Sequence, residues 1–324
     1  MNARANNRVA VIIPVHAAAF LHEALASVFG QLRPADQVIV IDDGAPDQSA
    51  IQDAIARWPG RLTLLRQANA GAAAARNAGL AAASVDWVAF LDADDRWQPE
   101  FLDRQMGFLH AHPEVDLVWA DATIVGETPA AGRTFMSMCP STGEVTLESL
   151  LAQTCNVLTS TVVVRRNLVM EAGSFDVALR RGQDFDLWLR LVARGAFAAY
   201  QQEILAVRRL HGENLSGTRL NELERALHVF AKALKTLPLT RQEQDAARQR
   251  VRALNGELAR EHVKVRLILG DFEEARRLLD AAHSAAPNWK LLAARLGLRL
   301  APALVRRLYM ARGAALGAAT TSMI

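Results

Sequence analysis

The sequence predicts an α/β domain with a mostly parallel sheet flanked by helices, followed by an all-helical extension. Over the first 120 residues, short apolar runs rich in β-branched residues alternate with helical segments about 12 residues long. This alternation is typical of parallel strands joined by right-handed crossovers. From residue 219 onward the periodicity is helical throughout. We therefore predict two domains, at residues 1–218 and 219–324.

The first two predicted strands end at a proline or at a turn sequence, neither of which continues a strand. Pro14 closes the first apolar run, and the turn Asp42-Asp43-Gly44 closes the second. The predicted strands are residues 9–13, 37–41, 62–65, 87–91 and 115–125, and the predicted helices are residues 18–30, 47–58, 72–83 and 101–112.

The second half of this domain is less regular. Residues 126–143 contain two prolines and are predicted to form a long loop that moves. Helices are predicted at residues 146–153, 166–172 and 182–194, and strands at residues 160–165 and 207–210. The helices of the extension are predicted to break at Pro238, Gly270, Pro287 and Pro302.

The composition excludes several classes of protein. The 324 residues are 51% hydrophobic and 22% charged, as in ordinary globular proteins. Two cysteines provide neither a disulfide framework nor metal-ligand spacing, which favours a reducing compartment. Residues 1–8 do not resemble a secretory signal, and no apolar run reaches the roughly 18 residues of a spanning helix. We expect a cytoplasmic protein.

The charge is distributed unevenly. Residues 1–218 carry 18 basic and 24 acidic side chains, whereas residues 219–324 carry 19 basic and 10 acidic ones. The net charge is +3, and no acidic residue follows Asp280. The basic extension is either an ordinary solvated surface or a surface attracted to anionic lipid headgroups or another polyanion. The second interpretation predicts peripheral contact with the inner membrane surface.

The strongest chemical signal is at residues 87–95, where an apolar strand ends in Asp92, Asp94 and Asp95. Carboxylates this close repel each other unless a cation or hydrogen bonds absorb the charge. Ligands usually bind at this end of a strand in an open α/β sheet. Mg²⁺ and Mn²⁺ favour one or two carboxylates together with phosphate oxygens. Alternation along a strand predicts Asp92 and Asp94 on one side and Asp95 on the other. The alternative is a capped turn.

Two further segments can bind a nucleotide. Asp43 can accept a hydrogen bond from a pyrimidine base or a ribose hydroxyl, although Asp43 and Gly44 can equally form an ordinary turn. Residues 69–79 are mostly small, so their backbone can approach a ligand closely, and Arg76 can reach a phosphate or a base. The alternative for this segment is a well-packed alanine-rich helix.

Asp184 and His211 are candidates for chemistry in the second half of the domain. Asp184 lies at the start of the helix predicted at residues 182–194, where the helix dipole favours its ionised form. An ionised carboxylate can take a proton from an acceptor hydroxyl. The alternative is that Asp184 only caps the helix. His211 can contact a diphosphate or a metal, but a lone histidine is more often structural.

Together, these segments resemble the inverting glycosyltransferases of family 2, which have the GT-A fold. The resemblance runs from residue 9 to residue 216 in the order that the family shows. It lies in residues 11–14, 42–47, 69–79, 90–95 and 159–195.

The resemblance implies a role for each candidate residue. Pro14 and His16 flank the nucleotide, and Asp43 and Arg76 hold the nucleoside. Asp94, helped by Asp92, binds Mg²⁺ or Mn²⁺ that bridges the donor diphosphate. Asp184 is the catalytic base, and His211 and Arg209 contact the diphosphate.

The chain departs from the family's pattern at three places. His16-Ala17 stands where Tyr-Asn is usual, and Ala45-Pro46 replaces Ser-Thr. Gln183 stands where glutamate is common before the base, so position 183 cannot act as an acid.

The function implied is transfer of a sugar from a nucleotide-diphosphate donor to a hydroxyl acceptor, with inversion. The acceptor would be a surface or lipid-linked glycan in polysaccharide biosynthesis of the cell envelope, and no nucleic acid partner is expected. The alternative is a non-catalytic scaffold that binds nucleotide sugars. A nucleotidyltransferase or a dinucleotide-dependent dehydrogenase would need a glycine-rich loop after the first strand, and none is present.

The extension has a partial resemblance of its own. Residues 270–288 are similar to the second helix of a tetratricopeptide repeat, but only one such unit is recognisable.

Overall fold

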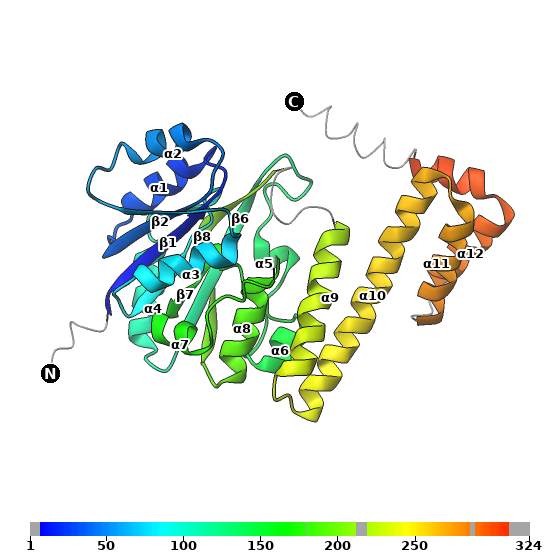
Figure 1. Cartoon of the computed structure of the whole chain (residues 1–324). Helices are drawn as coiled ribbons and strands as arrows, with labels where there is room; N and C mark the ends of the chain where they lie inside the picture. The colour runs from blue at the N-terminus through cyan, green and yellow to red at the C-terminus, as the bar shows by residue number, and fades with distance from the viewer. Residues whose placement is uncertain (1–6, 180, 212–218, 286–288, 311–324) are drawn as a thin grey trace. The chain divides into compact units, whose positions relative to one another are not determined.

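The computed structural model describes residues 7–179, 181–211, 219–285 and 289–310 (Figure 1). The chain divides into two compact units, Met1–Gly212 with Lys235–Glu243, and Glu213–Leu234 with Gln244–Ile324. Within the described ranges, none of the helices combines the length and the apolarity that crossing a bilayer requires.

The first unit contains an eight-stranded sheet in the order β3-β2-β1-β4-β7-β6-β8-β5. The strands are β1 (Val9–Val15), β2 (Gln37–Asp43), β3 (Thr63–Gln67), β4 (Trp87–Phe90), β5 (Arg96–Trp97), β6 (Leu117–Gly126), β7 (Val163–Arg165) and β8 (Ala198–Leu210). The first four strands are parallel, as predicted. The second half is mixed, because β7 runs antiparallel to both β4 and β6 and β5 runs antiparallel to β8.

Helices lie on both faces of the parallel half of the sheet (Figure 1). They are α1 (Leu21–Phe29), α2 (Gln48–Ile55), α3 (Ala72–Ala82) and α4 (Phe101–Ala111), each inside a predicted range. Val11 and Ile13 of β1 pack with α1 and α2, whereas the intervening Ile12 faces α3. Side chains alternate along a strand, so this apolar run is buried on both faces.

The remaining elements of this unit are short. They are α5 (Phe135–Met138), α6 (Leu147–Ala152), a 3₁₀ turn at Thr159–Thr161, α7 (Arg166–Glu171) and α8 (Gln183–Ala193). Part of the loop predicted at residues 126–143 is helical, in α5. The strand predicted at residues 160–165 is wrong in its first half, because the 3₁₀ turn occupies those positions and only β7 is extended.

The strand predicted at residues 207–210 is the end of the much longer β8. β8 pairs in parallel with β6 over most of its length, and its last part pairs with the two-residue β5. Arg96 is opposite Val207 and Trp97 is opposite Ala206. The basic end of β8 therefore lies beside the segment that follows β4.

The described residues of the C-terminal part form helices joined by short breaks. It contains α9 (Arg219–Thr236), α10 (Arg241–Leu269), α11 (Phe272–Ala285), α12 (Trp289–Leu300) and a further helical segment at residues 302–310. The breaks predicted at Pro238 and Gly270 are confirmed, and a further helical segment starts at Pro302, directly after α12 ends. Pro287 lies outside the described residues.

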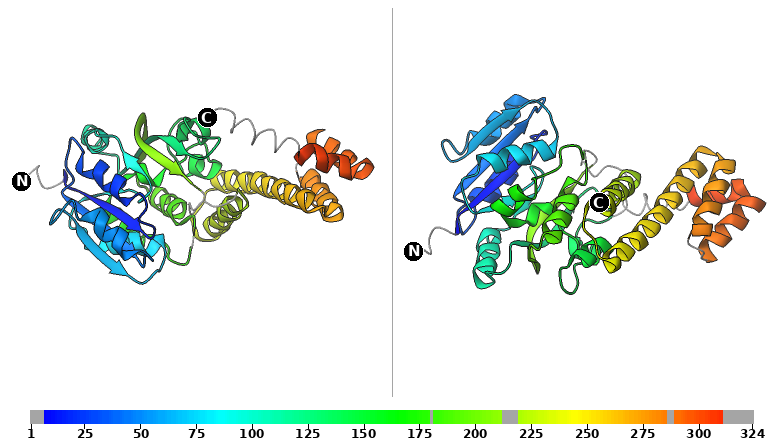
Figure 2. Two further views of the ribbon diagram at one scale, coloured as in Figure 1. Left: turned by 90° about the horizontal axis from the view of Figure 1, so that it is seen from above. Right: turned by 60° about the horizontal axis from the view of Figure 1, so that its bottom comes forward.

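α11 and α12 lie side by side and share a small apolar core with the end of α10 (Figure 2). The buried residues of this core are Val263, Leu267, Ala275, Leu279, Ala282, Leu291 and Leu298. The resemblance of residues 270–288 to a tetratricopeptide repeat stays a prediction.

Gly79 of α3 provides a test of the packing between α3 and the sheet. An added Cβ at Gly79 would lie 2.5 Å from Ile12 Cγ2 and 3.0 Å from Ile41 Cδ1. We expect Gly79→Ala to lower the free energy of unfolding by about 1–3 kcal/mol, because overpacking outweighs the roughly 1 kcal/mol that alanine gains in a helix. Equilibrium unfolding in urea measures this change.

The matched control is Gly107→Ala in α4, where an added Cβ meets no atom within 4 Å. We expect this control to be neutral or stabilising. Equal effects of the two substitutions would contradict the packing described for α3.

Candidate functional site

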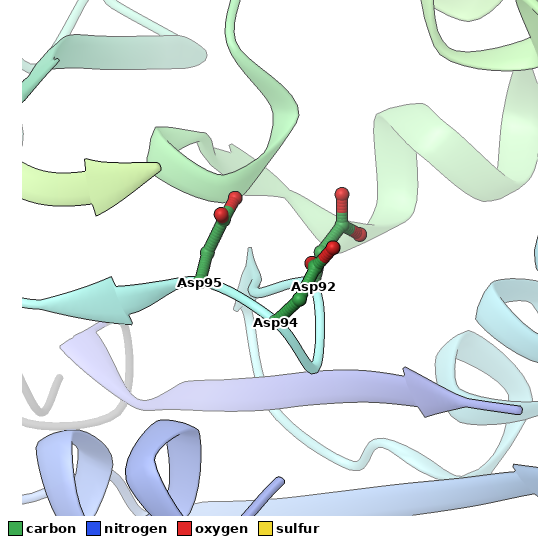
Figure 3. A group of neighbouring side chains, drawn as sticks. All are labelled: Asp92, Asp94 and Asp95. Carbon is green, nitrogen blue, oxygen red and sulfur yellow. The ribbon is translucent and has the colours of Figure 1, made fainter. Parts of the chain in front are cut away.

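Three carboxylates gather where the chain leaves β4. The strand ends at Phe90, and a turn follows in which the backbone N–H of Asp95 donates to the carbonyl of Asp92 at 3.1 Å. One carboxylate oxygen from each of Asp92, Asp94 and Asp95 lies within 4.8 Å of the others (Figure 3). The prediction that Asp95 points to the opposite side is therefore wrong, because these residues form a turn and no longer alternate as in a strand. We call residues 92–95 the acidic turn.

Burial makes the charge on the acidic turn costly. Asp95 is only 5% exposed, and its burial, with Asp94 and Asp92 nearby, raises its pKa from 3.8 to about 8. Hydrogen bonds from Ser160 and from the backbone N–H of Arg209 oppose this rise. Burial and the charge of Asp92 also raise the pKa of Asp94. A cation at this turn would stabilise the ionised carboxylates.

Arg76 supplies a positive charge to the acidic turn. It projects from α3, is buried, and places Nη2 2.5 Å from Asp92 Oδ1. Its guanidinium also lies over the ring of Phe175, 5.5 Å from the centroid. The neighbouring Asn77 exchanges two hydrogen bonds with the backbone of Phe175, at 2.8 and 2.9 Å. The predicted contact of Arg76 with a nucleoside stays a prediction, and the contact present in the structure is with Asp92.

The residues predicted to surround the nucleoside lie together at the ends of β1 and β2. Pro14 is opposite Ile41 in the sheet, and His16 Nδ1 lies 3.1 Å from the carbonyl oxygen of Asp43. The buried carboxylate of Asp43 accepts three hydrogen bonds, from Gln67 Nε2 and from the backbone N–H groups of Ala70 and Gly71, at 2.8, 2.8 and 2.9 Å. Asp43 therefore holds the loop between β3 and α3 in place.

Gly44 explains how this loop approaches so closely. It has φ +64°, and an added Cβ would lie 2.6 Å from the backbone nitrogen of Asn69. Only glycine tolerates both conditions. The strand predicted to stop at Asp42-Asp43-Gly44 runs on through Asp43, and the chain bends only at Gly44. Asp47 caps α2 through a 3.0 Å hydrogen bond from the N–H of Ala50.

A buried 3₁₀ turn of three hydroxyl residues joins the acidic turn to Asp184. Thr159 Oγ1 donates to Asp184 Oδ2 at 2.9 Å, while the next residue, Ser160, accepts from the backbone N–H of Asp92 at 3.3 Å. Trp97 Nε1 donates to the carbonyl of Ser160 at 2.6 Å and anchors the turn. Two consecutive side chains therefore connect the candidate base with the candidate metal ligands.

The sequence interpretation missed this turn because it assigned the segment to a strand. One signal was available. Thr159, Ser160 and Thr161 follow an apolar residue and precede a β-branched strand, which predicts that they are buried, and they are. Buried hydroxyls need hydrogen-bond partners, and nearby carboxylates can provide them.

Asp184 is the second residue of α8. The helix begins after Gly182, which has φ +75° and provides no side-chain cap. Asp184 is therefore not the N-cap, and its Oδ1 accepts from the N–H of Phe185 at 2.9 Å. Gln183 beside it is buried, and its Oε1 has no hydrogen-bond partner among the described residues.

The end of β8 contacts the acidic turn, as its pairing with β5 requires. His211 Nε2 lies 3.1 Å from Asp94 Oδ2, and the N–H of Arg209 donates to Asp95 Oδ1 at 2.8 Å. The Arg209 guanidinium bonds Glu23 at 2.7 Å and lies 4.0 Å from the centroid of the Phe20 ring. The sequence interpretation did not identify Glu23 or Phe20, since nothing in the local sequence connects them with Arg209.

Comparison with known proteins finds a family that resembles most of the first unit. Glycosyl transferase family 2 matches residues 10–170. The amylovoran biosynthesis glycosyltransferase AmsE of Erwinia amylovora is 29% identical over 189 residues, which are 57% of this chain and 68% of that protein.

Two solved structures share the fold. S. aureus TarS 1–349 in complex with UDP-GlcNAc has a TM-score of 0.59 at 19% identity, covering 86% of this chain and 82% of that one. The mannosyltransferase PcManGT from Pyrobaculum calidifontis, in complex with GDP-Man and Mn²⁺, has a TM-score of 0.63 at 22% identity. The match covers 98% of this chain and 86% of that one. The predicted fold class is confirmed. Residues 10–170 are therefore similar to glycosyl transferase family 2, and the chain has a GT-A-like fold.

Proposed function

We propose that this glycosyltransferase is metal-dependent and moves a sugar from a nucleotide-diphosphate donor to a hydroxyl acceptor with inversion. The observation that carries the proposal is the acidic turn, which Thr159 and Ser160 connect with Asp184. A metal–diphosphate site and a base for the acceptor are thereby linked through adjacent residues of one rigid segment.

The residues of the acidic turn fit a hard divalent cation. All three candidate donors are carboxylate oxygens, the ligand type that Mg²⁺ and Mn²⁺ prefer. Asp92 and Asp94 are partly exposed, so a ligand can reach them, whereas Asp95 is buried. When bound, Mg²⁺ or Mn²⁺ would offset the charge that develops on the departing diphosphate. The PcManGT complex, which holds Mn²⁺ together with GDP-Man, supports this proposal.

The proposed mechanism assigns separate tasks to the protein's own groups. Asp94 and Asp92 provide metal-binding oxygens, Arg76 balances the charge of Asp92, and His211 orients Asp94. Asp184 accepts the proton of the acceptor hydroxyl as that oxygen attacks the anomeric carbon. Attack from the face opposite the leaving group inverts the anomeric centre. The Thr159 hydroxyl positions Asp184 through a 2.9 Å hydrogen bond.

For the nucleoside we propose the edge of the sheet at the ends of β1 and β2, where Pro14, His16 and Asp43 lie. Three hydrogen bonds already fix Asp43, so it is preorganised rather than free to move toward a base. We propose a surface or lipid-linked glycan as the acceptor, in polysaccharide biosynthesis. The name of AmsE, an amylovoran biosynthesis glycosyltransferase, supports this class.

A donor screen tests the proposal. Release of nucleoside diphosphate from UDP-, GDP- and dTDP-sugars is measured with Mn²⁺, with Mg²⁺ and with a chelator. We expect release from one donor class that depends on the metal. Binding of a nucleotide sugar without release, in the presence of candidate glycan acceptors, would favour the non-catalytic scaffold.

Asp94→Asn tests the metal assignment. Loss of a metal ligand removes several kcal/mol of stabilisation from the transition state, so we expect turnover to fall by ~10³-fold and Mn²⁺-dependent donor binding to be lost. Calorimetry with Mn²⁺ and the donor measures the binding. The matched control is Asp103→Asn, an exposed carboxylate in α4. An Asp94→Asn enzyme with normal turnover would disprove the assignment.

Asp184→Asn separates the base from the donor site. We expect turnover to fall by about 10²–10⁴-fold, since general base catalysis supplies a factor of this size. Donor affinity in the presence of Mn²⁺ should stay within a factor of about two, because Asp184 does not contact the donor in this mechanism. Loss of donor binding, or normal turnover, would show that the base lies elsewhere.

Asp95→Asn tests the cost of the buried charge in the metal-free protein. Because the pKa of Asp95 is raised from 3.8 to about 8, the folded state retains a proton that the unfolded state loses, and stability falls as the pH rises between these values. Asparagine keeps the acceptor for the N–H of Arg209 but carries no charge.

We therefore expect the metal-free Asp95→Asn protein to be more stable than the parent at pH 8. Its free energy of unfolding should be higher by on the order of a few kcal/mol, which raises its Tm. The difference should disappear near pH 4 and shrink when Mn²⁺ is added. Thermal unfolding in a chelator across this pH range measures it. A variant less stable than the parent at pH 8 would contradict the burial argument.

A further inference from the structure

α12 has apolar side chains on two faces, one of them buried and the other exposed to solvent. Leu291 and Leu298 belong to the core shared with α11. Trp289, Leu292, Leu296 and Leu300 lie in a different sector of the same helix, since positions three or four apart share a face. All four are exposed, Trp289 by 73% and Leu300 by 83%. We call these four residues the leucine face.

The next helical segment also has exposed leucines. Leu304 and Leu308, one turn apart at residues 302–310, are both exposed, whereas Val305 between them packs against the core. Single exposed apolar residues are normal on soluble proteins, but a contiguous row of large ones marks a binding surface.

The charge around the leucine face is positive and has few carboxylates to balance it. Asp280 is the last acidic residue of the sequence, and Arg295 and Arg299 of α12 both approach it. Arg295 and Arg299 also lie three residues after Leu292 and Leu296, beside the leucine face. Arg306 and Arg307 are exposed on the next helical segment. The surface therefore combines exposed leucines and a tryptophan with an excess of arginines over carboxylates.

We propose that the leucine face binds the surface of a bilayer that contains acidic phospholipids. The leucines and Trp289 would enter the boundary between headgroups and acyl chains, and the neighbouring arginines would attract the lipid phosphates. α12, with 12 residues, is shorter than the roughly 20 residues of a spanning helix, so it would lie in the plane of the interface.

The charge favours a lipid surface over a second copy of this chain. In a twofold dimer the same face meets itself, so arginines of α12 and of residues 302–310 would meet arginines, and neither helix carries a carboxylate of its own. An anionic bilayer supplies the missing negative charge. This inference goes beyond sugar transfer and can fail or succeed independently of it.

Vesicle co-sedimentation of the full-length chain tests the proposal. The vesicles are either pure phosphatidylcholine or two-thirds phosphatidylcholine with one-third phosphatidylglycerol. In about 0.1 M NaCl we expect sedimentation with the anionic vesicles only, and we expect it to weaken in about 0.5 M NaCl, where exposed charges are screened. The Asp94→Asn protein should sediment like the parent, which separates this result from that of the transfer assay.

Two pairs of substitutions locate the surface. The first pair is Leu296→Ser with Leu300→Ser, which removes apolar area that would be buried in the bilayer. The second pair is Arg299→Gln with Arg307→Gln, which removes attraction to the lipid phosphates. We expect each pair to weaken partition into anionic vesicles by about tenfold or more. The matched controls alter exposed residues of the other unit, Leu32→Ser with Phe197→Ser and Arg57→Gln with Arg194→Gln. The controls should bind as the parent does.

Several results would overturn the proposal. The parent protein could fail to sediment with anionic vesicles, or it could sediment equally with neutral ones. The serine variants could retain full vesicle binding. Size-exclusion chromatography could also show that Leu296→Ser with Leu300→Ser converts a dimer into a monomer while vesicle binding is unchanged, in which case the face joins two copies of the chain. Circular dichroism confirms that each variant keeps its helices.

Discussion

The candidate site of the first unit depends on how the fold accommodates three carboxyl groups that a single turn holds together. One oxygen of each lies within 4.8 Å of the others, and Asp95 is buried whereas Asp92 and Asp94 are partly exposed. The compensation comes from elements far apart in sequence: Arg76 from α3, Ser160 from the 3₁₀ turn, and the N–H of Arg209 with His211 from the end of β8. A buried charge without a partner costs several kcal/mol, and α3, the 3₁₀ turn and the end of β8 supply these partners where they converge on the end of β4.

The 3₁₀ turn at Thr159–Thr161 is what makes this convergence rigid. Its backbone is tied to Trp97 and to Gln105 of α4, and its hydroxyls serve both Asp184 and the acidic turn. A side chain on a loop would allow the base and the metal ligands to drift apart, whereas adjacent residues of a buried turn hold them at a fixed separation. Preorganisation of this kind reduces the reorganisation needed when the transition state forms.

The sequence predicts the parallel half of the fold well because its evidence is local. Each of β1 to β4 is an apolar run bounded by a residue that ends a strand, and the carboxylates at Asp43 and Asp92 mark the functional edge of the sheet. The second half depends on distant pairing. β5 is two residues long and exists only because β8 lies beside it, and most of β8 is too polar to be recognised as a strand. The same reason explains why the direction of Asp95 and the pairing of Arg76 with Asp92 were not predicted.

The local charge also explains why the proposed reaction needs a cation. Arg76 and the hydrogen bonds from His211, Ser160 and Arg209 balance part of the charge on the acidic turn, but they leave more carboxylates than cations. A diphosphate carries negative charge of its own, so this turn would repel it. A divalent ion reverses the sign of the local field and makes the same residues attractive to the donor. Gln183 is consistent with this balance, because a glutamate at that buried position would add another carboxylate beside Asp184.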